Sequence, residues 1–315
     1  MTALLDLPTP LQPVPRLAVA LGLGEHDLWL KRDDLGGIGG GGNKLRKLAV
    51  AVEEARAGGA DTLVTTGAAQ SNHARLTAAV GARLGYDVVL VLRGEEPSAR
   101  RGNLLLDDLL GARIVWAGDV PMTGAGSLDD VARRTVEELR AAGRAPHLVP
   151  YGGTSPTTAE GYSVAAAELL TQLPDAAGGP QHVVVAVGSG GTMAGLVAGL
   201  GPRRVLGVDT GAVPDPRATV ADLLDRMGQP TPPAELRLDR DRVGEGYAAL
   251  VPEVRAAVEL VARTEGVLLD VTYVGRAAAG LLAAVRDGRI APGEPTVLMH
   301  TGGLPGLLGH PALVG

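Results

Sequence analysis

Short apolar segments recur along the whole chain, and they constrain its fold more than any other feature. Several are apolar at every position rather than at alternate positions, which is typical of strands covered on both faces, as in parallel sheets under helices. The segments between them carry apolar residues at helical spacing. Strands that alternate with helices predict a doubly wound α/β fold with mainly parallel sheets. The predicted strands are LWLK near Leu28, TLVTT from Thr62, VVLVL from Val88, RIVWA from Arg113, HLVPY from His147, VVVAV from Val183, VLGVD from Val205 and TVLMH from Thr296.

The composition excludes several classes of protein. The formal net charge is −6, without a basic block, so nucleic acid is not an expected partner. No apolar run reaches the roughly 20 residues that cross a bilayer. Cysteine is absent, which excludes disulfides and thiolate chemistry and is compatible with the cytoplasm, where we expect the protein. The histidines are scattered without metal-ligand spacing, so we predict no catalytic metal.

A run of glycines, GGIGGGGNKLRK from Gly36 to Lys47, precedes a predicted helix. It is not a nucleotide-binding P-loop, because Asn43 stands where that motif needs lysine and Leu45 where it needs a hydroxyl. It is not a linker either, because an amphipathic helix follows at once. That helix has apolar residues at positions 45, 48, 49, 52 and 55, a plausible N-cap at Asn43 and a plausible stop at Gly58.

Lys44 falls in the first turn of this helix. The helix dipole disfavours a cation there, and burial would lower its pKa further. Both effects favour the neutral amine, which is the form that makes Schiff bases. The alternative interpretation is a solvated lysine at a helix start, like its neighbour Lys47. The run of four consecutive glycines exceeds what a tight turn needs, and it suggests a roomy or mobile wall for a pocket.

Ligands of open α/β sheets bind where strands end and helices begin. The segment VGSGGTMAGL follows an apolar strand, and its glycines let backbone N–H groups turn toward an anion at a helix N-terminus. We interpret it as a phosphate site, with a tight turn that binds nothing as the alternative. A dinucleotide fingerprint lacks its third glycine at Met193, although Asp209 follows at a fitting distance, so a Rossmann dehydrogenase stays open. The residues of this loop are Gly188, Ser189, Gly190, Gly191 and Thr192.

A Schiff-base lysine, a separate phosphate loop, and small hydroxyl or amide side chains are together what pyridoxal 5'-phosphate needs. Lys44 would take its aldehyde and the loop at Gly188 its phosphate. Asn72 could donate to its phenolic oxygen, and Thr301 could meet its ring nitrogen.

Five segments resemble the D-cysteine desulfhydrase and 1-aminocyclopropane-1-carboxylate deaminase family, from about Thr9 to His310. They are KRDDLGGIGGGGNKLRKL, GADTLVTTGAAQSNHARLTAAVGARLG, VGSGGTMAGL, GVLLDVTYVGRAAAGL and HTGGLPGLLGH. These are pyridoxal-phosphate enzymes of the tryptophan-synthase-β-like fold. The resemblance implies two domains, residues 1–48 plus 162–315 as the larger and 49–161 as an inserted smaller one, and a homodimer.

The resemblance also implies roles for single residues. It makes Lys44 the Schiff-base lysine and Ser71 a catalytic and substrate-binding hydroxyl. It places Gln70, Asn72 and His73 around cofactor and substrate. Capping or packing is the alternative for the histidine. It matches Tyr273 and Tyr247 to active-site tyrosines, for which half-buried packing is the alternative.

The chain departs from the family next to the expected pocket. Val274 stands directly after Tyr273, where the deaminases have an acidic residue, and Arg276 replaces a lysine. Gly152 to Ser155 read GGTS, where the family has a motif like GGSN. The valine disfavours cyclopropane opening.

The residues and the resemblance together predict β-elimination on a small amino acid, with D-cysteine giving pyruvate, ammonia and sulfide. The alternatives are L-cysteate, 1-aminocyclopropane-1-carboxylate, and a lyase of natural-product biosynthesis. A catalytically silent ligand-binding regulator is the alternative that is not an enzyme.

Overall fold

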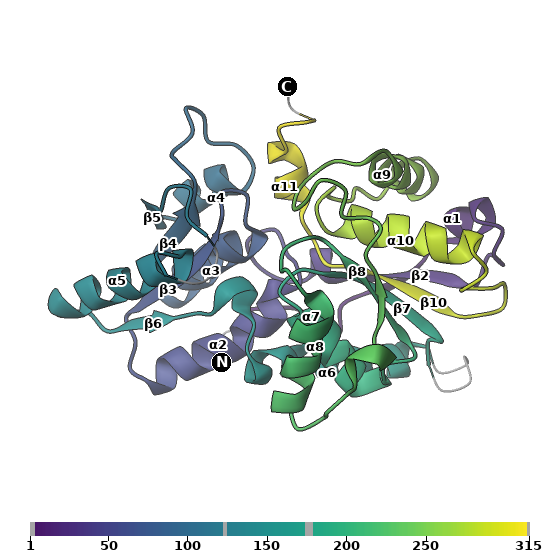
Figure 1. Ribbon diagram of the computed structural model, residues 1–315, viewed down its shortest axis with the longest axis horizontal. Helices are drawn as coiled ribbons and strands as arrows, with labels where there is room; N and C mark the ends of the chain where they lie inside the picture. Colours follow the sequence, from purple (N-terminus) through teal and green to yellow (C-terminus); the bar gives the residue numbers. More distant parts are fainter. Residues whose placement is uncertain (1–3, 122–124, 174–178, 314–315) are drawn as a thin grey trace. The chain divides into compact units, whose positions relative to one another are not determined.

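The computed structural model describes residues 4–121, 125–173 and 179–313. The chain divides into two compact units (Figure 1). The first unit holds the described parts of Met1–Leu5, Gly37–Thr154 and Pro305–Gly315, and the second unit holds Asp6–Gly36 and Ser155–Leu304. The division into residues 49–161 and the remainder, implied by the resemblance, stays a prediction.

The first unit is built on a parallel sheet of four strands in the order β5-β4-β3-β6. Apolar residues on one face of this sheet pack with α2, α3 and α4, and those on the other face pack with α5. Val64, Val89 and Val91 face α5 while Leu63 and Leu90 face the opposite side, so both faces are covered. The strands are β3 (Thr62–Ala68), β4 (Asp87–Arg93), β5 (Arg113–Trp116) and β6 (Pro146–Leu148), and the helices are α2 (Lys44–Ala57), α3 (Asn72–Leu84), α4 (Asn103–Leu109), α5 (Leu128–Ala141) and the 3₁₀ turn η2 (Tyr151–Gly153).

The second unit is built on a sheet of six strands in the order β1-β2-β10-β7-β8-β9. All neighbours are parallel except β1 and β2. Figure 1 shows α1, α9 and α10 on one face of this sheet and α6, α7 and α8 on the other. The strands are β1 (Leu11–Pro13), β2 (Leu28–Arg32), β7 (His182–Val187), β8 (Val205–Asp209), β9 (Arg237–Asp239) and β10 (Thr296–His300).

The helices of the second unit pack closely where small residues allow it. A Cβ added at Gly195 of α7 would lie 2.2 Å from the Ala159 carbonyl oxygen of α6, so these two helices need glycine at their contact. The helices are α1 (Pro15–Ala20), α6 (Pro156–Gln172), α7 (Gly191–Leu200), α8 (Pro216–Arg226), α9 (Pro252–Glu265), α10 (Val274–Arg286), and the 3₁₀ turns η1 (Asp33–Leu35) and η3 (Pro233–Glu235); α11 (Leu304–Gly309) begins at the end of this unit.

The α/β fold predicted from the sequence is confirmed, and each of the eight predicted segments overlaps a strand. The predicted helix after the glycine run is α2, with Gly58 at its C-cap. Asn43 stands at the predicted N-cap position, but its backbone is already in the helical region and its side chain makes no capping hydrogen bond. No helix in the described parts of the chain is long and apolar enough to cross a membrane.

Candidate active site

Lys44 is the first residue of α2, in the first unit, and its side chain is half-buried. The apolar face of α2, with Leu45 and Leu48 fully buried, fixes the direction in which this first turn points. Burial lowers the pKa of the Lys44 amine to about 8, against a smaller opposing effect of a hydrogen bond with Lys47. A substantial share of the amine is therefore neutral at mildly alkaline pH, as Schiff-base formation requires.

The glycine run before Lys44 follows a path that few other residues could take. Gly39 to Gly42 all have positive φ, between 62° and 128°, a region that favours glycine. A Cβ at Gly39 would also lie 2.5 Å from the Ala79 Cβ of α3. The carbonyl oxygens of Gly39 and Gly41 both accept hydrogen bonds from Nη1 of Arg75, the second at 3.1 Å. This attachment to α3 favours an ordered wall over the mobile one suggested by the sequence.

Lys47 lies one turn beyond Lys44 and is fully buried, which corrects its interpretation as a solvated lysine. Its Nζ donates to the Gly152 carbonyl oxygen at 3.1 Å and to Thr154 Oγ1 at 2.8 Å. Burial, together with the charge of Lys44, holds the pKa of Lys47 well below its usual value. The sequence could not distinguish the two lysines, because the burial of Lys47 depends on η2, which lies more than 100 residues further along the chain.

His73 is also buried, with its Nε2 2.8 Å from Thr65 Oγ1. The threonine hydroxyl donates to the Val149 carbonyl oxygen at 2.9 Å, so it accepts from the histidine, whose Nε2 therefore carries the hydrogen. Burial, reinforced by the charges of Lys44 and Lys47, keeps the pKa of His73 well below its usual range. The ring is a neutral group that packs beside the two lysines.

Ser71 is the N-cap of α3, shortly after β3 ends at Ala68, and Asn72 is the first residue of the helix. Ser71 Oγ caps the helix by accepting from the Ala74 amide at 3.1 Å, which leaves its O–H as a donor. Asn72 Oδ1 accepts from Asn103 Nδ2 at 3.0 Å. The Ser71 hydroxyl and the backbone amides at the N-terminus of α3 are donors suited to an anionic group such as a carboxylate.

The Gln70 side chain bonds the backbone of the segment that leads into α4. Its Nε2 donates to the Arg101 carbonyl oxygen at 3.0 Å, and its Oε1 accepts from the Asn103 amide at 2.9 Å. The amide therefore holds the segment before α4, and a substrate contact by Gln70 remains a prediction.

In the second unit, the loop from Gly188 to Thr192 joins β7 to α7. A Cβ at Gly188 would lie 3.2 Å from Cε1 of Tyr273, and Gly190, at φ +86°, is the N-cap of α7. The glycines thus keep side chains away from the backbone amides at the helix start. Such a turn can hold a phosphate against the positive end of the helix dipole.

Tyr247 and Tyr273 are brought together in the second unit. Their hydroxyl oxygens are 2.6 Å apart, and their rings pack edge to face with centroids 6.1 Å apart. Burial raises the pKa of the Tyr247 phenol. The sequence places these residues 26 positions apart, and it gave no sign that they would share a hydrogen bond.

Asp270 fixes the backbone around Tyr273. Its carboxylate accepts from the amides of residues 272, 273 and 274 at 3.0, 2.8 and 2.9 Å. Burial raises the pKa of Asp270 to about 6, although these hydrogen bonds oppose the rise. Val274, the first residue of α10, points into the core and is fully buried.

Arg276 anchors the segment that carries Tyr247. Its guanidinium donates to the carbonyl oxygens of Gly246 at 2.8 Å and Ala249 at 2.7 Å, and also to that of Thr210. The sequence marked Arg276 only as a departure from the family pattern, and it did not indicate these hydrogen bonds to the segment of Tyr247.

Thr301, the residue predicted to meet the ring nitrogen, follows β10 directly and is 8% exposed.

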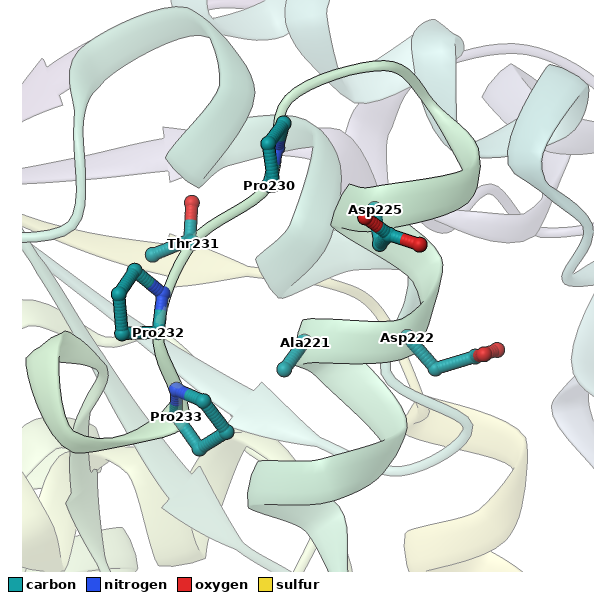
Figure 2. A pocket seen from close by; sticks show the side chains of 7 residues that line it. All are labelled: Ala221, Asp222, Asp225, Pro230, Thr231, Pro232 and Pro233. Carbon is teal, nitrogen blue, oxygen red and sulfur yellow. The ribbon is translucent and has the colours of Figure 1, made fainter.

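The second unit has a surface hollow of about 430 Å³ (Figure 2). It is formed by α8 and the segment after it, and no predicted site residue lines it. The lining residues are Ala221, Asp222, Asp225, Pro230, Thr231, Pro232 and Pro233. In the described parts of the chain, no group of three or more His, Cys, Asp or Glu side chains could hold a metal ion.

Each unit, taken by itself, holds a group that suits one part of pyridoxal phosphate. An amine of lowered pKa suits its aldehyde, and a glycine turn at a helix N-terminus suits its phosphate. The class defined by fold and site is therefore an enzyme that uses this cofactor. The family model for pyridoxal-phosphate dependent enzymes (PALP) matches residues 3–302, and the chain belongs to this family.

Relatives of known name cover nearly the whole chain. A D-cysteine desulfhydrase of Klebsiella pneumoniae is 39% identical, over 98% of this chain and 96% of that protein. A putative 1-aminocyclopropane-1-carboxylate deaminase of Pyrococcus abyssi is 38% identical, over 95% of this chain and 90% of that protein. A solved structure described as an ACC deaminase homologue has a TM-score of 0.86 at 34% identity, covering 98% of this chain and 93% of its own.

Proposed function

We propose that the protein catalyses β-elimination on a small sulfur-containing amino acid, with D-cysteine as the first candidate. Water is consumed, and the products are pyruvate, ammonia and sulfide. The observation that carries this proposal is Lys44, an amine with a pKa of about 8 at the start of α2, in a chain that is 39% identical to a D-cysteine desulfhydrase. We further propose a homodimer in the cytoplasm.

Lys44 is the residue that would bind the cofactor's aldehyde, and the loop from Gly188 to Thr192 would bind its phosphate. Asn72 would donate to the phenolic oxygen, and Thr301 would meet the ring nitrogen. When bound, pyridoxal phosphate supplies an electron sink for the charge that develops at the substrate's α-carbon.

The chain's own residues supply the proton transfers and the substrate's position. Lys44 Nζ takes the proton from the α-carbon, because its lowered pKa keeps part of the amine neutral. The Ser71 hydroxyl and the N-terminus of α3 hold the substrate carboxylate. The Tyr247 and Tyr273 pair donates a proton to the departing sulfur, for which the phenol of raised pKa remains protonated at neutral pH.

The second candidate is 1-aminocyclopropane-1-carboxylate deamination, which the name of the Pyrococcus abyssi relative favours. Val274 disfavours this reaction, because its buried side chain offers no acid or base beside Tyr273. L-Cysteate and a substrate of natural-product biosynthesis are further candidates.

The test is a product assay on the purified enzyme with D-cysteine, L-cysteine, L-cysteate and 1-aminocyclopropane-1-carboxylate, with Lys44→Ala as the control. We expect pyruvate and sulfide from D-cysteine, and none from the control. Release of 2-oxobutanoate from the cyclopropane substrate alone would favour the second candidate. Bound cofactor without turnover of any of them would favour a ligand-binding regulator.

A further inference from the structure

Asn103 is fully buried at the start of α4 and makes hydrogen bonds in three directions within the first unit. Its Oδ1 accepts from Arg75 Nε at 3.2 Å. Its Nδ2 donates to the Gln70 carbonyl oxygen at 3.0 Å and to Asn72 Oδ1 at 3.0 Å. It therefore connects Arg75 to the loop that begins α3.

The orientation of the Asn103 amide is fixed by its partners. A guanidinium can only donate, so the group that faces Arg75 must be the oxygen. A backbone carbonyl can only accept, so the group that faces Gln70 must be the nitrogen. Both hydrogens of Nδ2 are then used, one by the Gln70 carbonyl and one by Asn72.

This orientation determines that of Asn72. Because Asn103 offers it a donor, Asn72 must present Oδ1 to Asn103, and its own Nδ2 points elsewhere as a donor. Within the described residues, no hydrogen bond uses that Nδ2. A donor is what a phenolate oxygen needs, whereas the opposite orientation would present an acceptor and repel it.

Arg75 holds in place the relay of hydrogen bonds that runs through Asn103 to Asn72. It is fully buried, and the same guanidinium that donates to Asn103 also holds the carbonyls of Gly39 and Gly41 before Lys44. One side chain thus ties the wall beside the Schiff-base lysine to the amide that orients Asn72.

We propose that Asn103, held by Arg75, is a positioning residue that sets the amide of Asn72 with its N–H group directed toward the phenolic oxygen of pyridoxal phosphate. This inference rests on the proposed role of Asn72. It requires no contact between Asn103 and the cofactor.

The test is a double-mutant cycle of Asn103→Asp and Asn72→Ala, read as the dissociation constant of pyridoxal phosphate from the cofactor-free protein. Aspartate keeps the shape and the bond to Arg75, but it can only accept, so Asn72 turns its N–H group inward to meet it. We expect each single variant to weaken binding about tenfold, the effect of losing one hydrogen bond to a charged oxygen. The double variant should bind no more weakly than Asn72→Ala.

Effects that multiply to about a hundredfold would overturn the proposal, because Asn103 would then act independently of Asn72. Wild-type binding by Asn103→Asp would overturn it too. Wild-type binding by Asn72→Ala would refute the role of Asn72 itself. Asn103→Ala removes the amide without inverting it, and it replaces Asn103→Asp in the cycle if that variant does not fold. Asp108→Asn, on the same helix but outside the relay, should bind like wild type. Product release by the wild type tests the proposed reaction separately.

Discussion

Replacing Asp107 with asparagine should make the stability of the protein less dependent on pH. Both carboxylate oxygens of Asp107 are buried in α4, and neither has a hydrogen-bond partner among the described residues. Burial raises the pKa of Asp107 to about 7 from 3.8, although the charges of Arg75 and Arg100 oppose the rise. The folded protein thus holds a proton that the unfolded chain releases near pH 4.

The sign and size of the effect follow from this difference. Between pH 3.8 and 7 the folded state binds the extra proton, so the free energy of unfolding falls by about 1.4 kcal/mol per pH unit as the pH rises. From pH 5 to pH 8.5 the contribution of Asp107 therefore drops by about 2–3 kcal/mol. Asparagine cannot ionise. The difference in unfolding free energy between variant and wild type should therefore be about 2–3 kcal/mol larger, in favour of the variant, at pH 8.5 than at pH 5.

Urea unfolding of the cofactor-free protein at pH 5 and pH 8.5 measures the effect. The difference in unfolding free energy between variant and wild type is compared at the two pH values, so all other titrating groups cancel. Asp222→Asn, on the exposed surface of α8, is the control and should change little at either pH. Parallel curves for wild type and Asp107→Asn across this range would refute the reasoning.

Other predictions concern the site residues. Lys44→Ala should leave no cofactor adduct after borohydride reduction and peptide mapping, whereas the wild type should give one at position 44; an adduct at another lysine would contradict the assignment. Capture of pyridoxal phosphate by the cofactor-free protein should quicken about tenfold per pH unit below about pH 8 and level off above it, because only the neutral Lys44 amine reacts; a flat profile would count against the lowered pKa. Tyr273→Phe should reduce kcat by roughly 10²–10⁴ while cofactor affinity stays near wild type, since the hydroxyl is proposed to serve proton transfer; an unchanged kcat would remove it from the mechanism. Gly39→Ala should lower the free energy of unfolding by about 1–3 kcal/mol in a denaturation assay, because its Cβ would lie 2.5 Å from that of Ala79 at a positive φ.

The strands and the family motifs could be predicted because their signals are local. An unbroken apolar run such as VVVAV needs no knowledge of its neighbours to indicate a covered strand. The edge strands β1 and β9 were missed because their sequences, LQP and RLD, contain no apolar run. Lys44 was singled out from the glycines and the helix beside it, and its role stays a prediction.

The residues that hold the site together were not predictable in the same way. Arg75 lies 36 residues from Gly39 and 28 from Asn103, and an isolated arginine in a helical pattern is typical of an exposed face. Asn103 and Arg276 likewise act through backbone carbonyls, which every residue carries. Only the folded chain shows which carbonyls meet which donors.

The hydrogen bond between Tyr247 and Tyr273 limits how many protons the two hydroxyls can donate to other groups. A hydroxyl has one hydrogen, so in the 2.6 Å contact one phenol gives its hydrogen to the other, and only the second phenol has a hydrogen for any other acceptor. In the proposed reaction the pair would therefore deliver one proton at a time, and the hydrogen-bonded partner could replace a proton that the first phenol loses.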